Sequence, residues 1–215
     1  MPKHVDPDAR RREVVDALFR VAVRDGLQRA SLRAVAEEAA LNIGSVRHYF
    51  AGQQELMRFA MQSMLDRVGG RLLRRVEEIG TLADHAPAEQ FRLAAGLLEE
   101  LLPLTESRRA EVIVFLEFSA AARTHPAFAD LAEQAATGTR SLLRRILGRL
   151  AETGALGAGR DLSVETERLA ALLDGLGLGA ALHPHVVAPH TATEALRTHL
   201  ADLAAPAPRH PGAEG

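Results

Sequence analysis

Apolar residues return every three or four positions along most of this chain, which is the period of an amphipathic α-helix. In the segment 9–24, for example, Val14, Leu18 and Ala22 are four residues apart, so they lie on one side of a helix. β-branched residues, which favour strands, are sparse. The pattern predicts an all-α fold, with helices over 9–24, 32–39, 43–50, 53–79, 88–102, 106–123, 126–153, 164–182 and 192–203.

The composition supports this prediction. Ala, Leu and Arg, which are strong helix formers, dominate the sequence. Hydrophobic residues make up 47% of the 215 positions, which is enough for a core in one large domain or two small ones. A net charge of −2 argues against a histone-like protein that binds DNA by charge alone, but it allows a dimer with a local basic face.

Short polar side chains precede most of the helical segments and predict where the helices begin, because their oxygens accept hydrogen bonds from free backbone amides. Gly26 follows the first helix, as glycine often does at a helix end. Pro87 suits the first turn of a later helix. The predicted N-caps are Asp6 or Asp8, Ser31, Asn42, Thr105, Ser163 and Thr191.

Two short helical segments near the N-terminus meet at a tight corner made by Ala40 and Leu41. Val46 and Phe50 lie on the side of the second segment that rests on the rest of the domain. The opposite side carries small, polar and basic residues: Gly44, Ser45, Arg47 and His48. Such a side suits the major groove of DNA, which admits one helix and displays donors and acceptors. The stretch therefore predicts a helix-turn-helix.

Residues of one known pattern recur through this stretch: Ser31, Val35, Ala36, Ala39, Leu41, Asn42, Gly44, Phe50 and Leu56. At these positions the chain resembles the TetR family of transcriptional regulators. The resemblance implies an N-terminal three-helix DNA-binding domain at 1–52 and a larger helical regulatory and dimerisation domain at 53–203. The Pro- and Ala-rich tail at 204–215 is predicted to be disordered.

Departures from the family pattern affect the expected DNA contacts. Ala40 replaces the usual turn glycine, which adopts a positive φ more freely. Gln53 replaces a lysine that meets a DNA phosphate in the family, and Arg47 can supply that charge or read a guanine. Tyr49 stands at a usual histidine. The predicted DNA-contacting residues are Ser31, Asn42, Gly44, Ser45, Arg47, His48, Tyr49 and Gln53.

Arg10, Arg11 and Arg12 at the start of the first helix have two interpretations. They can contact the phosphate backbone, since this end of the first helix approaches DNA in the family. They can equally form a solvated face with partners such as Asp16. Both interpretations stay open at the level of sequence.

The last two helices are predicted to form a dimer interface. Small residues between Gly175 and Ala181 allow another helix to approach closely, and neighbouring leucines supply apolar area. The family dimerises through these helices, and intrachain packing is the alternative. The layout also resembles the BetI-type subgroup, notably at Ala122-Arg-Thr-His-Pro126. The predicted interface residues are Leu172, Leu176, Gly177, Ala180, Leu196 and Leu200.

A pocket for a small-molecule effector is predicted among the C-terminal helices. The segment 112–118 is apolar on nearly all sides, which is typical of a buried helix. Apolar walls with a few polar groups are typical of ligand sites. The candidate lining residues are Phe91, Phe115, Glu117, Phe118, Arg123 and His183. Core packing of the aromatic residues, and an exposed or salt-bridged Glu117, are the alternatives.

Several classes of protein are disfavoured. The chain has no Cys, which excludes disulfides and thiolate chemistry. It has no Gly-x-Ser-x-Gly motif and no phosphate-binding loop, and its histidines lack the spacing of a zinc protease. We therefore expect no enzyme activity, no cofactor and no metal site. Without a signal-like apolar segment or an apolar run of about 18 residues, we expect a bacterial cytoplasmic protein, nucleoid-associated when bound to DNA and without a membrane partner.

Together these features predict a sequence-specific DNA-binding regulator. The resemblance implies a homodimeric repressor that binds a palindromic double-stranded operator and is released by a small-molecule effector. A TetR-like activator is one alternative. The other is an all-α protein–protein interaction module that does not bind DNA.

Overall fold

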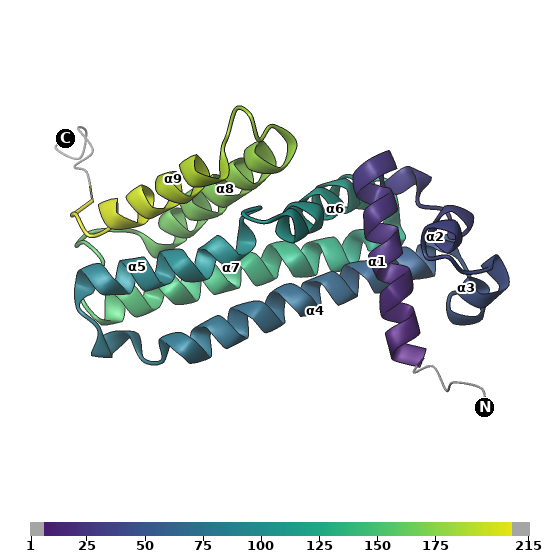
Figure 1. Cartoon of the computed structure of the whole chain (residues 1–215). Coiled ribbons are helices and arrows are strands. Elements are labelled where there is room, and N and C mark those ends of the chain that lie inside the picture. The colour runs from purple at the N-terminus through teal and green to yellow at the C-terminus, as the bar shows by residue number, and fades with distance from the viewer. Residues whose placement is uncertain (1–6, 208–215) are drawn as a thin grey trace. The chain divides into compact units, whose positions relative to one another are not determined.

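The structure of the chain is a computed structural model that describes residues 7–207 (Figure 1). Every regular element in this described part is helical, which confirms the predicted all-α fold. The α-helices are α1 Pro7–Asp25, α2 Leu32–Glu38, α3 Ile43–Tyr49, α4 Gln53–Ile79, α5 Pro87–Leu98, α6 Glu106–Ala122, α7 Ala129–Glu152, α8 Leu162–Leu182 and α9 Pro189–Asp202. Short 3₁₀ turns join some of them: η1 Leu27–Arg29, η2 Leu82–Asp84, η3 Glu99–Leu101 and η4 Pro126–Phe128.

The chain packs into two compact units. Unit 1 contains Met1–Val68 and Thr105–Ala135, and unit 2 contains Gly69–Leu104 and Ala136–Gly215. Helices α4 and α7 each contribute residues to both units. This division follows the packing of the helices, whereas the functional boundary between 52 and 53 remains a proposal.

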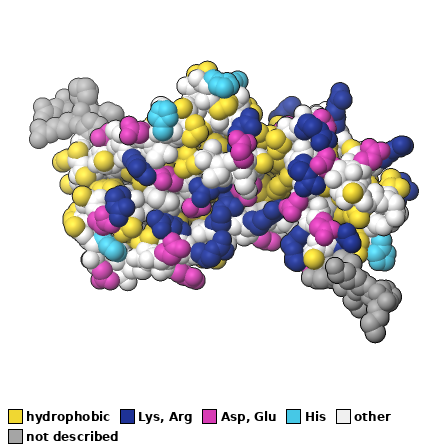
Figure 2. Space-filling view, in the orientation of Figure 1, with side chains coloured by type: hydrophobic (Ala, Val, Ile, Leu, Met, Phe, Trp, Pro, Cys, Tyr) yellow, Lys and Arg dark blue, Asp and Glu magenta, His cyan; other side chains and the backbone are white. Residues whose placement is uncertain are grey.

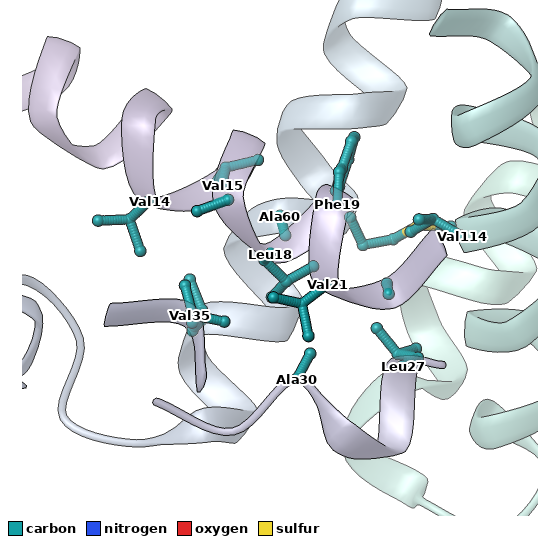
Figure 3. Packing of buried hydrophobic residues seen from close by; sticks show 14 of the residues in the cluster. Val14, Val15, Leu18, Phe19, Val21, Leu27, Ala30, Val35, Ala60 and Val114 are labelled. Carbon is teal, nitrogen blue, oxygen red and sulfur yellow. The ribbon is translucent and has the colours of Figure 1, made fainter. Parts of the chain in front are cut away.

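The core of unit 1 joins the helix-turn-helix to α6. Helix α1 packs against α2 and also against α6, and their buried side chains meet in one cluster that also includes residues of α4 (Figure 3). Val14 and Leu18 of α1, Val35 of α2 and Val114 of α6 all belong to this cluster and are almost fully buried. The helices of the helix-turn-helix region therefore share one apolar core with part of the following region.

The core of unit 2 is built from α5, α7, α8 and α9. Helix α9 packs against both α5 and α8. Leu98, Leu147, Leu169 and Leu196, one from each helix, are fully buried within this cluster. Because the four helices share one core, the C-terminal helix is an integral part of the unit.

The predicted helix starts are confirmed at Ser31, Asn42 and Thr105, whose side chains accept hydrogen bonds from amides one turn on. The prediction for Ser163 is wrong, because Asp161 caps α8 by accepting from Ser163 N at 2.7 Å. The predictions for Thr191 and Asp8 are also wrong. Helix α9 begins at Pro189, whose missing N–H needs no cap, and Asp8 lies inside the first turn of α1. Asp6 lies outside the described residues.

The segment after α9 differs from the predicted disorder in its first residues. Ala207 N donates to Ala158 O at 3.0 Å, and Arg160 Nε donates to Ala205 O at 2.9 Å. These two bonds, one donated by the tail and one accepted by it, hold 205–207 against the loop before α8. The rest of the predicted tail, 208–215, lies outside the described residues.

Candidate nucleic-acid interface

Two capped helices form the helix-turn-helix, which Figure 1 shows beside α1. Ser31 Oγ accepts from Ala34 N at 3.2 Å and opens α2. Asn42 Oδ1 accepts from Ser45 N at 2.7 Å and opens α3. Val46 is fully buried and Phe50 nearly so, and they fix one side of α3 to the core. Because that side is anchored, the opposite side is presented in a defined orientation.

The turn between α2 and α3 is strained at Ala40. This residue has a φ of 53°, the one positive φ at a non-glycine position among the described residues. The next amide, Leu41 N, donates to Ala36 O at 2.9 Å and closes the turn. The predicted corner is thus confirmed, although a side chain at this φ costs free energy that glycine would avoid.

The solvent-facing side of α3 carries Gly44, Arg47 and His48, all exposed. No described residue forms an ion pair or hydrogen bond with the Arg47 side chain, so its guanidinium group is available to a ligand. Ser45 and Tyr49 are half-buried, and the Tyr49 ring meets His48 edge-on at 5.2 Å. Five donors on a planar fork suit recognition of either a guanine edge or a phosphate.

The other predicted DNA contacts lie at helix starts. Ser31 and Asn42 accept amide hydrogen bonds as caps, which leaves the Ser31 hydroxyl proton and the Asn42 amide group able to donate. Gln53 is the first residue of α4 and is half-buried. These positions remain proposals for phosphate contacts.

Arginines at the start of α1 make contacts within the chain. Arg10 pairs with Glu13 at 2.6 Å, and the Arg11 guanidinium carbon lies 5.7 Å from the centre of the Phe59 ring. Both contacts favour the structural interpretation of these residues over a basic arm for DNA. Figure 2 shows acidic and basic side chains interspersed over the visible face, with no continuous basic surface.

An ion-pair cluster ties α2 to α1. Glu38, at the end of α2, accepts from Arg20 Nε and from Arg24 Nη1, each at 2.7 Å. The hydrogen bond from Arg20, followed by that from Arg24, lowers the pKa of Glu38. The cluster is largely exposed, so it adds little to the stability that the buried apolar contacts between α1 and α2 provide.

Glu117 has a role that the sequence does not reveal. Its Oε2 accepts a hydrogen bond from the backbone amide of Leu27, in the turn just before α2. The side chain is not salt-bridged in the described part of the chain, because the partner of its Oε2 is a backbone amide, and the prediction that it lines an effector pocket stays a prediction. A contact between positions 90 residues apart leaves no periodic or local signal in the sequence.

The predicted effector residues are divided between the two units. Phe91 is buried in the core of unit 2, and His183 is exposed at the end of α8. In unit 1, Phe118 is a core residue that packs on Phe128 with ring centres 5.0 Å apart, and Phe115 packs beside that core. Only Glu117 and Arg123 line the same open groove. The expectation of one pocket from all of these residues thus finds no support.

Four of the predicted dimer-interface residues are corrected by the structure. Leu196 and Leu200 are fully buried in the core of unit 2, and Ala180 and Gly177 are also buried within the chain. They face their own chain because α8 and α9 pack against each other. Leu172 and Leu176 are half-buried and pack beside the same core. Exposed residues of α8 form a different face: Val164, Ala171, Gly175, Leu178 and Leu182.

Gly175 and Gly179 of α8 have different surroundings. A Cβ at Gly179 would lie 2.9 Å from Val187 Cγ2, so this glycine lets the loop after α8 pack on the helix. Gly175 is exposed, and a Cβ there would meet nothing within 4 Å in this chain. Of the two, only Gly175 is placed to admit a second molecule.

In 7–207, no three His, Cys, Asp or Glu side chains lie close enough together to hold a metal ion. None of the helices in that range has the length and apolar content needed to cross a membrane.

Comparisons with known proteins relate most of the chain to transcriptional regulators. A family described as BetI-type transcriptional repressor, C-terminal, matches residues 90–205. The transcriptional regulator PksA of Bacillus subtilis (strain 168) is 35% identical over 184 residues, which cover 86% of this chain and 84% of PksA.

Solved structures are also similar to this chain. The crystal structure of a transcriptional regulator from Rhodococcus sp. Rha1 is 30% identical, with a TM-score of 0.73, and the match covers 90% of this chain and 95% of that one. The multidrug binding protein EbrR, solved with imidazole, is 29% identical, with a TM-score of 0.56, over 98% of this chain and 96% of that one.

Proposed function

The chain belongs to the TetR family of DNA-binding transcriptional regulators, with a BetI-type C-terminal region, and we propose that it acts as a homodimeric repressor released by a small molecule. In this proposal two copies of α3 bind a palindromic operator. An effector that prefers the unbound arrangement then shifts the population away from DNA.

One observation carries the DNA-binding part of the proposal: the exposed side of α3 presents Arg47 without a partner in the described chain. Arg20, Arg24 and Arg58 of the same unit pair with carboxylates of their own chain, whereas Arg47 does not. Arg47 donates to a base edge or phosphate, while Ser31 and Asn42 add phosphate contacts from the two helix starts. Gly44 lets α3 approach the groove closely.

The dimer is proposed to form through the exposed face of α8. Leu178 and Leu182 are each nearly half exposed, at 45% and 46%. Together with Val164, Ala171 and Gly175 they make an apolar, small-residue face that a second α8 can approach closely. A dimer is also needed physically, because one short reading helix supplies too little specific affinity, and two read a palindrome.

The DNA-binding proposal is tested by selecting binding sequences from a random duplex library with the full chain. The expected result is a palindromic consensus whose half-sites are spaced by about one helical turn or more. A gel shift on that sequence should be lost with Arg47→Ala and kept with Arg149→Ala, an exposed arginine of α7 that pairs with Glu152. Failure to enrich any sequence would contradict a sequence-specific regulator.

The dimer proposal has a separate test. Light scattering after gel filtration should give a dimer for the parent chain and a monomer for Leu178→Glu. The matched control is Leu73→Glu, which changes another exposed leucine, 65% exposed on α4. A Leu178→Glu chain that stays dimeric would place the interface elsewhere.

An activator differs from a repressor only in the outcome of DNA binding. A promoter–reporter fusion in cells with and without the gene separates them, because loss of a repressor raises expression and loss of an activator lowers it.

A further inference from the structure

An open groove of about 1160 Å³ lies wholly within unit 1. One wall is the segment Asp25–Arg29 with the first residues of α4, and the other is the end of α6 with the connection to α7. Its volume is slightly above the range of about 300–1,000 Å³ that is typical of small-molecule sites. It contains neither Phe91 nor His183, so it is not the pocket expected from the sequence.

The charges that line the groove are unequally neutralised. Asp25 pairs with Arg24 at 2.9 Å, and the Glu117 carboxylate accepts from Leu27 N. Arg29 and Arg123 also line the groove, are exposed, and pair with no carboxylate in the part of the chain that the structure describes. Glu117 keeps its negative charge, because a backbone amide does not neutralise a carboxylate, but the two arginines have no ion-pair partner in the described chain. An anionic ligand would supply that partner.

Apolar side chains lie beside these arginines. Met57 of α4, Ala120 and Ala121 of α6 and Phe128 of η4 all line the groove, and each belongs to or packs against the unit 1 core, apart from Ala120. An anion without an apolar part would leave this apolar surface exposed to water. The combination fits a molecule with an acidic group and an apolar body.

We propose that this groove binds an organic anion, with its carboxylate or phosphate group held by Arg29 and Arg123 and its apolar body on Met57, Ala120 and Ala121. This inference gives the proposed effector response a binding site and a chemical class of ligand. Its regulatory meaning rests on the proposed function.

The position of the groove links its occupant to DNA binding. On one wall, η1 leads directly into the Ser31 cap of α2, and Gln53 begins α4. The opposite wall is fastened to these segments at two points. Glu117 accepts from Leu27 N, and Arg58 donates to Asp130 through two bonds of 2.7 Å and to Ala127 O. An anion that contacts both walls stabilises one arrangement of them, and by linkage the operator and the anion change each other's affinity by the same factor.

The test uses 8-anilinonaphthalene-1-sulfonate, a fluorescent anion with an apolar body, titrated into the full chain without DNA. The dissociation constant should rise about tenfold for Arg29→Ala and for Arg123→Ala, because each removes one charge-assisted contact. Arg123→Lys should recover most of the affinity, and Arg149→Ala should match the parent. Octanoate should displace the probe, whereas octanol, which has no charge, should not.

Both arginines are exposed, so the variants should keep the helical circular dichroism of the parent. Equal dissociation constants for the parent and both alanine variants, or no binding of the probe, would overturn the proposal. If the variants lose operator affinity while probe binding is unchanged, the arginines contact DNA phosphates, and the proposal is again wrong. A parent chain that binds the probe but no DNA would contradict the proposed function and leave the anion site standing.

Discussion

Glu117 of α6 accepts a hydrogen bond from the backbone amide of Leu27, which lies in the turn between α1 and α2. The turn begins at Gly26, whose φ of 91° is open to glycine, and it ends at the Ser31 cap. The carboxylate thus holds the segment that leads into the DNA-binding helices from a helix that follows the helix-turn-helix by more than 50 residues.

Glu117→Ala should lower the free energy of unfolding by about 1–3 kcal/mol, because it leaves the amide of buried Leu27 without an acceptor. Glu117→Gln should cost less, since its carbonyl oxygen can still accept. Urea denaturation gives these values, and hydrogen exchange should show a faster Leu27 amide in the alanine variant. Glu133→Ala, which removes an exposed carboxylate from α7, is the control. Equal stability of Glu117→Ala and the control would contradict this role.

Ala40→Gly should stabilise the chain slightly. The substitution removes about 1–2 kcal/mol of strain from the left-handed backbone. It also increases the conformational entropy of the unfolded chain, which lowers stability by about 0.4–1 kcal/mol. Ala39→Gly, at the neighbouring position with a φ of −81°, should only destabilise. Thermal unfolding of both variants decides the matter, and a lower melting temperature for Ala40→Gly than for the parent would show that the turn is unstrained.

His199 should make the chain sensitive to acid. Its burial, and next the nearby Arg168, lower its pKa below the usual value of 6.5, although Glu165 and Asp202 act in the opposite direction. Its Nε2 is buried without a partner in the described chain. Because the unfolded chain binds the proton more readily, stability is fully present above about pH 6.5 and falls as the pH drops through the folded pKa.

The check is urea denaturation at pH 7.5 and at pH 5.5. His199→Gln, which carries no proton at either pH, should lose less stability on acidification than the parent. His190→Gln changes an exposed histidine of the same helix and should behave like the parent. A His199→Gln chain with the full acid loss would assign the effect to other groups.

Gly157→Ala should destabilise the chain by about 1–3 kcal/mol or more. A Cβ at this position would lie 1.9 Å from Ala205 O, and backbone atoms cannot move aside as a flexible side chain can. Gly148→Ala is the control in the interior of α7, where a Cβ meets nothing within 4 Å. That variant should gain about 1 kcal/mol from helix propensity. Relative to the parent, the melting temperature should fall for Gly157→Ala and rise for Gly148→Ala. An unchanged melting temperature for Gly157→Ala would mean that 205–207 detach easily.

Much of the fold could be predicted from the sequence because helix period and helix caps are local signals. The helix period predicts α4 close to its bounds of Gln53–Ile79, and the caps predicted at Ser31, Asn42 and Thr105 are confirmed. The cap at Asp161 is not predicted, because Ser163, two residues later, has the same chemistry. Pro189 at the start of α9 is the correct signal, since it suits a first turn better than Thr191 suits a cap.

Of the candidate sites, too, only the one that local signals define could be predicted. The α3 face could be predicted, because the exposure of Arg47 and His48 follows from the position of buried Val46 on a short helix. The sequence does not show which leucines of α8 and α9 face outward, because both sides of α8 are apolar and only the packing of α9 distinguishes them. The groove beside Glu117 joins three separate stretches of chain, and no local pattern brings them together.

The central claim is that the exposed side of α3 reads DNA through Arg47. It is tested most directly by fluorescence anisotropy of the selected operator and of a scrambled duplex, over a series of salt concentrations. For Arg47→Ala we predict a loss of about 1–3 kcal/mol on the operator. If Arg47 reads a base, the loss falls on the operator alone, and if it binds a phosphate, both duplexes weaken and the salt slope drops by about one. Unchanged affinity for both duplexes at every salt concentration would contradict the claim.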